Sequence, residues 1–195
     1  MDEETLDFYE RRAAEWAAHL PHDHSPRLDP FLDRLPPGAA ILEMGCGDGR
    51  DAARMMARGF DVHPNDGTPA MARLASERLG RAVPVMDFAE LEAVETFDAV
   101  WCQASLLHLG EEELTPVLAR IHRALKPGGW HWASFKDGAG GGRDDVGRFF
   151  SYIPVDRLEA AYRAAGRWPV LEIGTQQGTS FFRGPTMWHE VLARK

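Results

Sequence analysis

Three glycines at alternate positions mark the segment of the chain with the clearest chemical meaning. Gly45, Gly47 and Gly49 follow a short apolar run and precede a helical pattern of residues. Glycines in that place let the backbone turn sharply and let a ligand approach the main chain, and the helix beyond offers unpaired amide hydrogens to an anionic group. Asp66 lies 21 residues after Gly45, at the end of the next predicted strand, where an acid accepts hydrogen bonds from ribose hydroxyls. The pattern predicts a site for a nucleotide-type cofactor.

The spacing of these glycines distinguishes two cofactors. A dinucleotide-binding loop has the form G-x-G-x-x-G, and its third glycine falls here on Arg50. The segment instead has the form E-x-G-x-G-x-G from Glu43, and Asp48 is poorly suited to lie beside a pyrophosphate. A loop that binds S-adenosylmethionine (SAM) passes a charged methionine tail and a sulfonium. We therefore expect SAM, with an NAD-linked oxidoreductase on the same type of fold as the alternative.

The elements that must position this loop alternate along the chain. Short apolar runs and helical patterns follow one another, which is typical of a parallel sheet covered by helices on both faces. Residues 138–142 contain four glycines, so 137–152 are expected to form either a mobile loop over an active site or a plain surface loop. The predicted strands are 39–44, 60–64, 82–86, 97–102, 129–135, 168–174 and 185–193, and the predicted helices are 3–20, 49–58, 68–79, 111–125 and 154–165.

Length and composition restrict the class of protein. With 195 residues, 44% of them apolar and 27% charged, the chain is expected to form one folded domain over residues 1–195. A net charge of −8 argues against a nucleic-acid partner, since such partners are bound by neutralising phosphates. No apolar stretch reaches the roughly 20 residues that span a bilayer, and the acidic start differs from a secretory signal. We expect a cytoplasmic protein.

Cysteine and histidine positions predict neither a disulfide framework nor a metal site. Cys46 and Cys102 are expected to be small buried residues with reduced thiols. His19, His22 and His24 lie across a predicted helix end, where their spacing favours a solvated loop over a metal centre.

Together these motifs resemble class I SAM-dependent methyltransferases, and more narrowly the small bacterial tellurite-resistance-type enzymes. The resemblance implies a three-layer α/β/α, Rossmann-like, doubly wound sheet of seven strands, mostly parallel with an antiparallel last strand. It also implies SAM as the cofactor and an unidentified small molecule as the methyl acceptor. The segments that carry it are ILEMGCGDGRDA at 41–52, GFDVHPNDGTPAM at 59–71, Met86-Asp87-Phe88, FDAVWCQASLLHL at 97–109, LKPGG at 125–129 and Ser134-Phe135-Lys136.

The same resemblance implies roles for individual residues in binding SAM. Arg50 has two interpretations, as a contact to the carboxylate of the cofactor or as a surface residue of the helix. The remaining implied contacts are Glu43, Gly45, Cys46 and Gly47 at the methionine part, Asp66 at the ribose, Met71, Asp87 and Phe88 at the adenine, Gln103 at the floor of methyl transfer, and Tyr9 and Trp16 on a helix of about 3–20 that closes over the cofactor.

The chain departs from the family pattern at two places. Pro64 stands where a glycine is usual, and Asn65 stands where an apolar residue is common, which casts doubt on the length of the second strand. Gln103-Ala104-Ser105-Leu106 replaces the N/D-P-P-Y/F tetrapeptide of enzymes that methylate exocyclic base nitrogens. The usual device for that reaction is therefore missing.

Methyl transfer from a sulfonium is an in-line displacement helped by alignment and desolvation, and a hydroxyl or amine acceptor also needs a proton acceptor within reach. His108 is a candidate for that role, or a structural histidine near a helix cap. Lys136 and Arg148 are candidates to pair with an anionic acceptor, or solvated cations. Phe149 and Tyr152 either wall an acceptor pocket or anchor the loop on the core. Since no residue is unambiguously catalytic, a SAM-binding protein without catalysis stays open.

Overall fold

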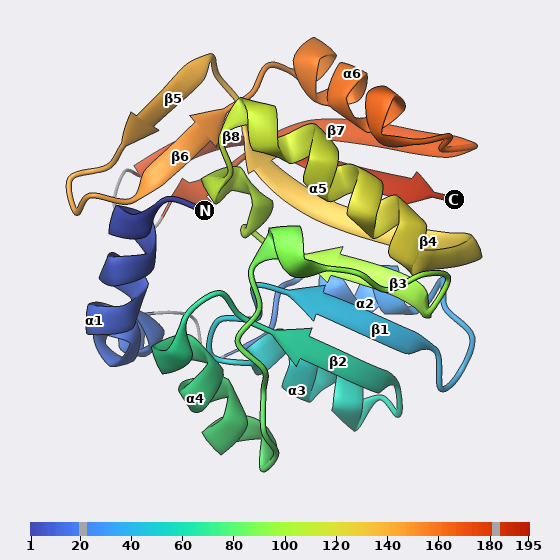
Figure 1. Cartoon of the computed structure of the whole chain (residues 1–195), viewed down its shortest axis with the longest axis horizontal. Helices are drawn as coiled ribbons and strands as arrows, with labels where there is room; N and C mark the ends of the chain where they lie inside the picture. Colours follow the sequence, from blue (N-terminus) through green and yellow to red (C-terminus); the bar gives the residue numbers. More distant parts are fainter. Residues whose placement is uncertain (20–22, 181–183) are drawn as a thin grey trace.

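The computed structural model describes residues 1–19, 23–180 and 184–195, and a mixed β-sheet forms its centre (Figure 1). His22, considered above with two other histidines, lies outside the described residues. The strands are β1 (Ala40–Met44), β2 (Asp61–Asn65), β3 (Phe97–Cys102), β4 (Leu125–Lys136), β5 (Gly140–Arg143), β6 (Phe149–Tyr152), β7 (Val170–Ser180) and β8 (Gly184–Arg194).

The sheet is parallel at one end and antiparallel at the other, as predicted. Strands β2, β1, β3 and β4 lie side by side and run in parallel, with Ile41 of β1 opposite Val62 on one side and Ala99 on the other. Strand β8 runs antiparallel to β4, and β7 runs antiparallel to β8. The chain changes direction across the sheet at β1, and doubly wound sheets bind ligands outside the carboxyl ends of the strands at such a point.

Helices cover both faces of this sheet (Figure 1). On one face, α2 (Leu28–Leu32) and α3 (Arg50–Ala57) pack against Trp101 of β3. On the other, α5 (Glu111–Ala124) and α6 (Val155–Ala165) pack against Val100. Helix α5 buries Leu114, Leu118 and Ile121, whose spacing places them on one side of the helix. Each such side chain contributes about 1.5–3 kcal/mol when it is fully buried.

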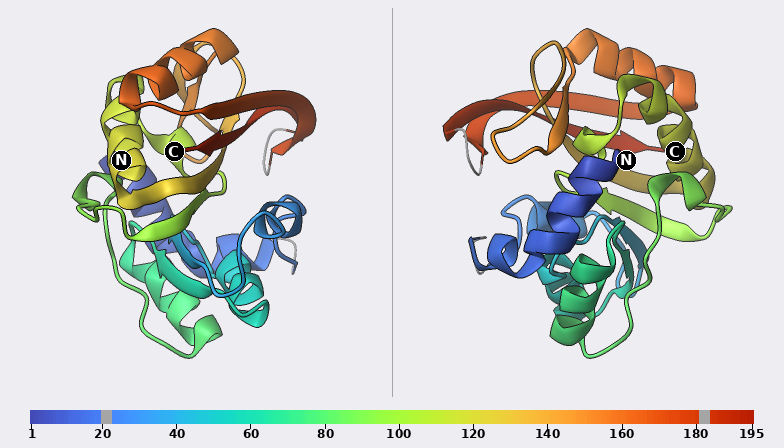
Figure 2. Two further views of the ribbon diagram at one scale, coloured as in Figure 1. Left: turned by 90° about the vertical axis from the view of Figure 1, so that its right-hand side faces the viewer. Right: turned by 60° about the vertical axis from the view of Figure 1, so that its left-hand side comes forward.

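The first helix lies across the carboxyl ends of β1 and β3 rather than over a face of the sheet (Figures 1 and 2). Helix α1 (Glu3–His19) packs its Ala13 against Ala70 and Met71 of α4 (Pro69–Leu79). The Glu10 carboxylate also accepts a hydrogen bond from the amide of Ala70 at 2.7 Å. Helix α1 is therefore held at the edge where the glycine loop emerges.

The predicted strand at 82–86 is wrong, because these residues make only one isolated bridge, between Asp66 and Val85. The amide of Asp66 donates to Pro84 and its carbonyl accepts from Met86, so the backbone groups of Asp66 face away from β1. Two residues earlier, Pro64 faces the same way and has no amide hydrogen to donate. The pairing at Asp66 therefore cannot extend back along β2 past Pro64.

Residues 137–152 form a hairpin where a loop was predicted. Strands β5 and β6 pair antiparallel, with Gly141 opposite Ser151, and β6 joins β4 in parallel at the Lys136–Tyr152 pair. These two strands raise the number in the sheet to eight, where seven were predicted with one at 82–86. Strand β4 also begins at Leu125 rather than 129, with a shift of register between its Phe97 and Ala99 partners.

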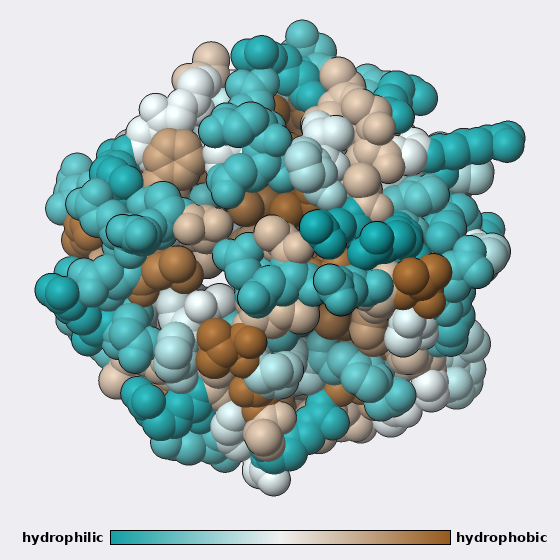
Figure 3. Space-filling view, viewed as in Figure 1, coloured by the Kyte–Doolittle hydropathy of each residue, from teal (hydrophilic) through white to brown (hydrophobic). Residues whose placement is uncertain are grey.

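One face of the molecule is mostly hydrophilic. On the face shown in Figure 3, hydrophilic residues dominate and apolar residues are scattered among them, as is ordinary for a folded chain. No helix among the described residues is long and apolar enough to cross a membrane.

Candidate active site

The glycine loop comes directly after β1, and at Gly45 it passes too close to Ser105 to leave room for a side chain. A Cβ atom added at Gly45 would lie 2.6 Å from the Cβ of Ser105, and the φ angle of Gly45 is +74°. A Cβ atom at Gly47 would lie 3.6 Å from the ring of Trp16, with φ at +58°. Gly45 therefore needs glycine for space as well as for backbone conformation, whereas Gly47 needs it for backbone conformation alone.

Asp66 fastens the glycine loop to the end of β2. Its Oδ2 accepts the amide hydrogen of Gly47 at 2.9 Å, and its Oδ1 accepts from the amide of Thr68 at 3.0 Å and from the Thr68 hydroxyl at 3.2 Å. Burial raises the pKa of the Asp66 carboxyl, although these hydrogen bonds oppose the shift. A carboxylate only accepts hydrogen bonds, so any further partner of Asp66 must be a donor.

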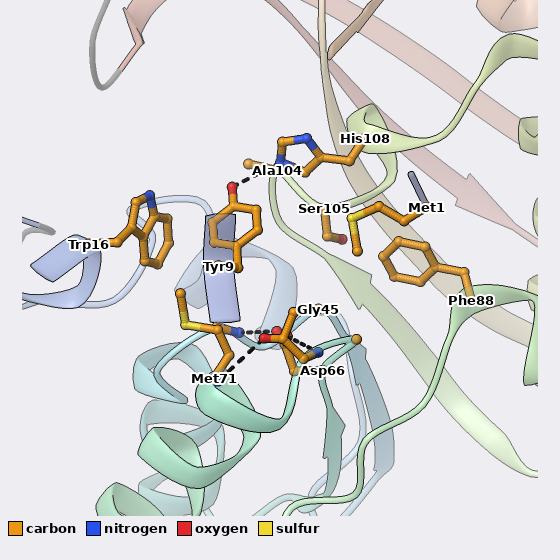
Figure 4. A pocket seen from close by; sticks show the side chains of 13 residues that line it. Met1, Tyr9, Trp16, Gly45, Asp66, Met71, Phe88, Ala104, Ser105 and His108 are labelled. Atoms are coloured by element: carbon orange, nitrogen blue, oxygen red, sulfur yellow. Dashed lines mark hydrogen bonds between the residues drawn. The ribbon is translucent and has the colours of Figure 1, made fainter. Parts of the chain in front are cut away.

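A hollow opens between α1 and the carboxyl ends of β1 and β3, with a volume of about 410 Å³ including its mouth (Figure 4). Asp66 and Met71 lie on one side of it, and Tyr9 and His108 lie on the opposite side. The residues that line it are Met1, Tyr9, Trp16, Gly45, Gly47, Asp66, Gly67, Thr68, Met71, Phe88, Ala104, Ser105 and His108.

A second hollow adjoins the first on the far side of Trp16, which lines both. Glu43 lies at its floor with only 3% of its surface exposed, and its Oε2 has no hydrogen-bond partner among the described residues. Burial raises the pKa of Glu43 well above its usual value, and Asp51 and Asp66 nearby raise it further. The residues that line this hollow are Trp16, Glu43, Gly45, Cys46, Gly47, Asp48, Arg50, Asp51 and Gln103.

The residues present fit a SAM molecule that spans the two hollows. The unpartnered carboxyl oxygen of Glu43 suits a charged amino group, which the methionine part of SAM carries, because a buried acceptor is costly without a donor. Gly45 and Gly47 leave a cradle at the join, where both line the two hollows, and the Asp66 carboxylate in the first hollow suits a hydroxyl donor. Arg50 and Gln103 both line the hollow that contains Glu43, although Gln103 was expected at the floor of methyl transfer.

Of the three residues expected at the adenine, Met71 and Phe88 line the first hollow and Asp87 does not. Phe88 is buried and lines the first hollow. Asp87 instead caps the short 3-10 helix Phe88–Glu90, where its Oδ1 accepts from the amide of Ala89 at 2.8 Å. Its side chain is 38% exposed, and it does not line the hollow. The side chain of Met1 lies beside Phe88 in this region (Figure 4).

His108 is held on both sides of its ring. Its Nδ1 lies 2.6 Å from the carbonyl oxygen of Phe149, which only accepts hydrogen bonds, so Nδ1 carries the proton and donates. Its Nε2 lies 3.0 Å from the hydroxyl of Tyr9 and therefore accepts from it. Burial lowers the pKa of His108 to about 4, and the charges of Arg148 and Lys136 lower it too. The ring is neutral at neutral pH.

The residues expected to contact an acceptor surround His108 from outside the first hollow. Arg148 is buried and pairs with Asp144, Nη2 to Oδ2 at 2.7 Å. The ammonium of Lys136, also buried, lies 3.4 Å from the ring centre of Phe150. The other two, Phe149 and Tyr152, lie on β6 and are half-buried.

Several residues of the site carry no local signal in the sequence. Ser105 closes over Gly45 and donates its hydroxyl hydrogen to the carbonyl of Met44 at 2.8 Å. Thr5 accepts the amide hydrogen of Phe149 at 2.8 Å and so joins α1 to β6. The spacing Asp144-x-x-x-Arg148 is the one sequence signal for an ion pair in this group of residues. Both cysteines are buried, and burial raises the pKa of each thiol. Among the described residues, no group of three or more potential ligands could hold a metal ion.

Comparison with known proteins agrees with this geometry. A family model described as a methyltransferase domain matches residues 41–129. The ubiquinone biosynthesis O-methyltransferase of Chromobacterium violaceum is 34% identical over 146 residues, which are 67% of this chain and 61% of that protein. The one from Hahella chejuensis is 36% identical over 118 residues, which are 55% of this chain and 48% of that protein. The chain thus spans about half to three-fifths of the length of these curated relatives.

Solved structures share the fold at lower identity. A SAM-dependent methyltransferase from Methanosarcina mazei aligns with a TM-score of 0.76 at 16% identity, over 89% of this chain and 98% of that one. The 1,6-didemethyltoxoflavin-N1-methyltransferase of Burkholderia thailandensis aligns with a TM-score of 0.74 at 23% identity, over 97% and 84%, and that structure holds S-adenosylhomocysteine.

The fold and the glycine loop therefore define a Rossmann-like methyltransferase. The methyltransferase-domain match, the relatives and the structural neighbours support a class I SAM-dependent methyltransferase, a family that uses S-adenosylmethionine as its cofactor.

Proposed function

We propose that this chain transfers the methyl group of SAM to an oxygen atom of a small-molecule acceptor, with His108 as the final proton acceptor. The observation that carries the proposal is the His108–Tyr9 pair at the wall of the first hollow. A neutral histidine whose Nδ1 is committed to a carbonyl presents its Nε2 lone pair as a base. The curated relatives are named O-methyltransferases, which supports oxygen as the atom methylated.

The residues divide the work by position. When bound, SAM supplies an electrophilic methyl group on sulfur. Glu43 would hold the methionine end and Asp66 the ribose, beside the hollow that Tyr9 and His108 line. An acceptor hydroxyl loses its proton to the oxygen of Tyr9, while the proton of Tyr9 passes to Nε2 of His108. Helix α1 covers this edge of the sheet and excludes water from it.

The two alternatives from the sequence have less support. The comparisons give no support to an NAD-linked oxidoreductase, and Arg50 occupies the place of the third glycine of a dinucleotide-binding loop. Different chemistry on this fold is represented by a structural neighbour described as the [4+2]-cyclase SpnF, which aligns with a TM-score of 0.72. That neighbour is 19% identical and shows the fold alone. An assay of turnover separates these interpretations.

The first test is calorimetry with SAM, S-adenosylhomocysteine and NAD as titrants. We expect binding of the first two and none of NAD. The second test follows release of S-adenosylhomocysteine with a panel of small phenols, carboxylates, thiols and amines. Turnover of a hydroxyl-bearing or carboxylate acceptor supports the proposal. Binding of SAM without turnover of any member, or turnover of thiols or amines alone, would contradict it.

The role of His108 is tested with its variants on the acceptor that the panel selects. We expect His108→Gln to lower kcat about 100-fold or more, in line with the usual contribution of a general base, and to leave SAM affinity almost unchanged. The matched control is His63→Gln, because His63 is half-exposed on β2 and lines neither hollow. Equal activity in His108→Gln and His63→Gln would remove His108 from the mechanism.

A further inference from the structure

Arg148 and Asp144 form a buried ion pair at the turn between β5 and β6. Their side chains are 5% and 3% exposed, and Nε and Nη2 of Arg148 lie 2.9 and 2.7 Å from Oδ2 of Asp144. The other carboxylate oxygen accepts the amide hydrogens of Val146 at 3.1 Å and of Arg148 at 2.9 Å. Asp144 therefore fixes both the turn and the direction of the guanidinium.

The guanidinium extends from this turn to α1. Its Nη1 donates to the hydroxyl oxygen of Tyr9 at 3.2 Å. Its central carbon lies 5.1 Å from the ring centre of Phe8 on α1 and 5.1 Å from that of Phe150 on β6. Arg148 thus joins the hairpin to the helix at the residue that contacts His108.

The hydrogen-bonding capacities of these groups allow one arrangement. Arginine only donates, so the oxygen of Tyr9 must accept from Arg148. The single hydrogen of Tyr9 then goes to Nε2 of His108, whose Nδ1 is already committed to the carbonyl of Phe149. One lone pair stays on the Tyr9 oxygen, and Tyr9 lines the hollow where an acceptor would lie.

We propose that Arg148, held by Asp144, is a positioning residue that orients the Tyr9 hydroxyl towards Nε2 of His108. This inference rests on the proposed function, because it assigns Arg148 to the same proton path. It differs from the role of acceptor contact that the sequence suggests for Arg148. Arg148 acts here through Tyr9 and does not touch the acceptor.

A purely structural role for the ion pair makes a different prediction. If Arg148 only closed the hairpin turn, or acted on His108 through its charge alone, its effect on His108 would not depend on the hydroxyl of Tyr9. If Arg148 acts through Tyr9, its effect on His108 disappears once that hydroxyl is removed. A double-mutant cycle separates the two.

The experiment measures the ¹⁵N resonances of His108 in histidine-labelled protein, assigned with His108→Gln, without any acceptor. The variants are Tyr9→Phe, Arg148→Lys and the double variant, with Arg157→Lys as a control on the exposed side of α6. Lysine keeps the charge opposite Asp144 but cannot bridge Asp144 and Tyr9 at once. Thermal melts identify the variants that fold.

We expect Arg148→Lys to move the Nε2 resonance towards its position in Tyr9→Phe, and to move it no further in the Tyr9→Phe background. Equal shifts in both backgrounds, or no shift in either, would overturn the inference. Calorimetry with S-adenosylhomocysteine gives an independent cycle if a variant is too unstable for NMR. Each single variant should weaken binding at least about tenfold, as expected for one hydrogen bond to a charged group, and the double variant no more than either.

The two proposals fail in different measurements. If no hydroxyl or carboxylate acceptor is methylated, the proposed function fails while the coupling of Arg148 to His108 is still observed. If the cycle is additive, the positioning inference fails whatever the acceptor panel shows.

Discussion

The carboxylate of Asp66 accepts the amide hydrogen of Gly47 at 2.9 Å, which ties the ends of two neighbouring strands into one cofactor-binding edge. The acid that the sequence places at a ribose is thus also the support of the loop that passes the cofactor. Removal of the Asp66 carboxylate should therefore weaken cofactor binding and disturb the geometry of the glycine loop together.

Asp66→Ala is expected to destabilise the fold by about 2 kcal/mol, since Gly47 and Thr68 lose their buried acceptor. Affinity for S-adenosylhomocysteine should fall at least about tenfold, because one lost charged hydrogen bond is worth about 1.5–3 kcal/mol. Urea unfolding and calorimetry measure the two effects. Asp61→Ala, on an exposed residue of the same strand, is the control and should change neither. Unchanged affinity in Asp66→Ala would contradict the ribose assignment.

Gly45→Ala tests the close approach of the glycine loop to Ser105. The new Cβ would lie 2.6 Å from the Cβ of Ser105, and the φ angle is +74°, so we expect a loss of about 3 kcal/mol from strain and overpacking together. Gly59→Ala is a matched control, because its φ is +83° and nothing lies within 4 Å of its added Cβ. It should lose only about 1 kcal/mol. Similar losses at the two sites would show that space at Gly45 is not limiting.

The buried His131 should make the fold sensitive to acid. It lies between the carbonyl of Val100 and the hydroxyl of Tyr162, and burial lowers its pKa from 6.5 to about 4. Between those two values the unfolded chain binds a proton that the folded chain does not, so stability is lost as pH falls from about 6.5 towards 4.

The cost for His131 alone is on the order of 2 kcal/mol at pH 5 relative to pH 8. Urea unfolding of the protein and of His131→Gln at both pH values isolates this contribution from other groups. The difference in unfolding free energy between the two proteins should shift by that amount in favour of the variant at pH 5. A difference that does not change with pH would mean that His131 takes up its proton while folded.

Asp51 should be needed to hold the segment before α2 against the sheet. Its Oδ1 accepts from the amide of Ser25 at 2.7 Å and its Oδ2 from the indole of Trp101 at 2.9 Å. Asp51→Ala leaves both donors buried without a partner, which we expect to cost about 2–4 kcal/mol. Asp51→Asn retains one acceptor and should cost about half as much, and chemical denaturation measures both. Equal losses would show that packing, not hydrogen bonding, sets the value.

The local part of the fold follows from the sequence. The run that ends at Met44, the glycines after it and the helix from Arg50 were predicted within a residue or two, because strand, turn and helix signals stand next to one another there. The predicted strand at 82–86 was wrong because its pairing with β2 needs an amide hydrogen at position 64, which Pro64 does not have. The hairpin was missed because its glycines give no strand signal that would indicate the pairing of Gly141 with Ser151.

In the site, too, the features set by local sequence were predicted, and those set by the tertiary fold were not. Asp66 was placed by its distance from Gly45 in the chain, and the structure brings it to the predicted edge. The contact of Tyr9 with His108 joins residues 99 positions apart, and no periodicity or motif specifies it. It follows from the position of α1 across the sheet edge, which depends on contacts such as Ala13 with Met71.

Pro64, which ends the pairing along the outer edge of β2, also protects that edge from association with a second molecule. An edge strand with free backbone groups is a template on which another chain can add, and such edges lead to aggregation. On the outward side of β2, the guanidinium of Arg81 donates to the carbonyl of Val62, and Pro64 has no amide hydrogen. The amide and carbonyl of Asp66 are already hydrogen-bonded to Pro84 and Met86. The departure from the family pattern that cast doubt on this strand is thus what seals its open edge against a second molecule.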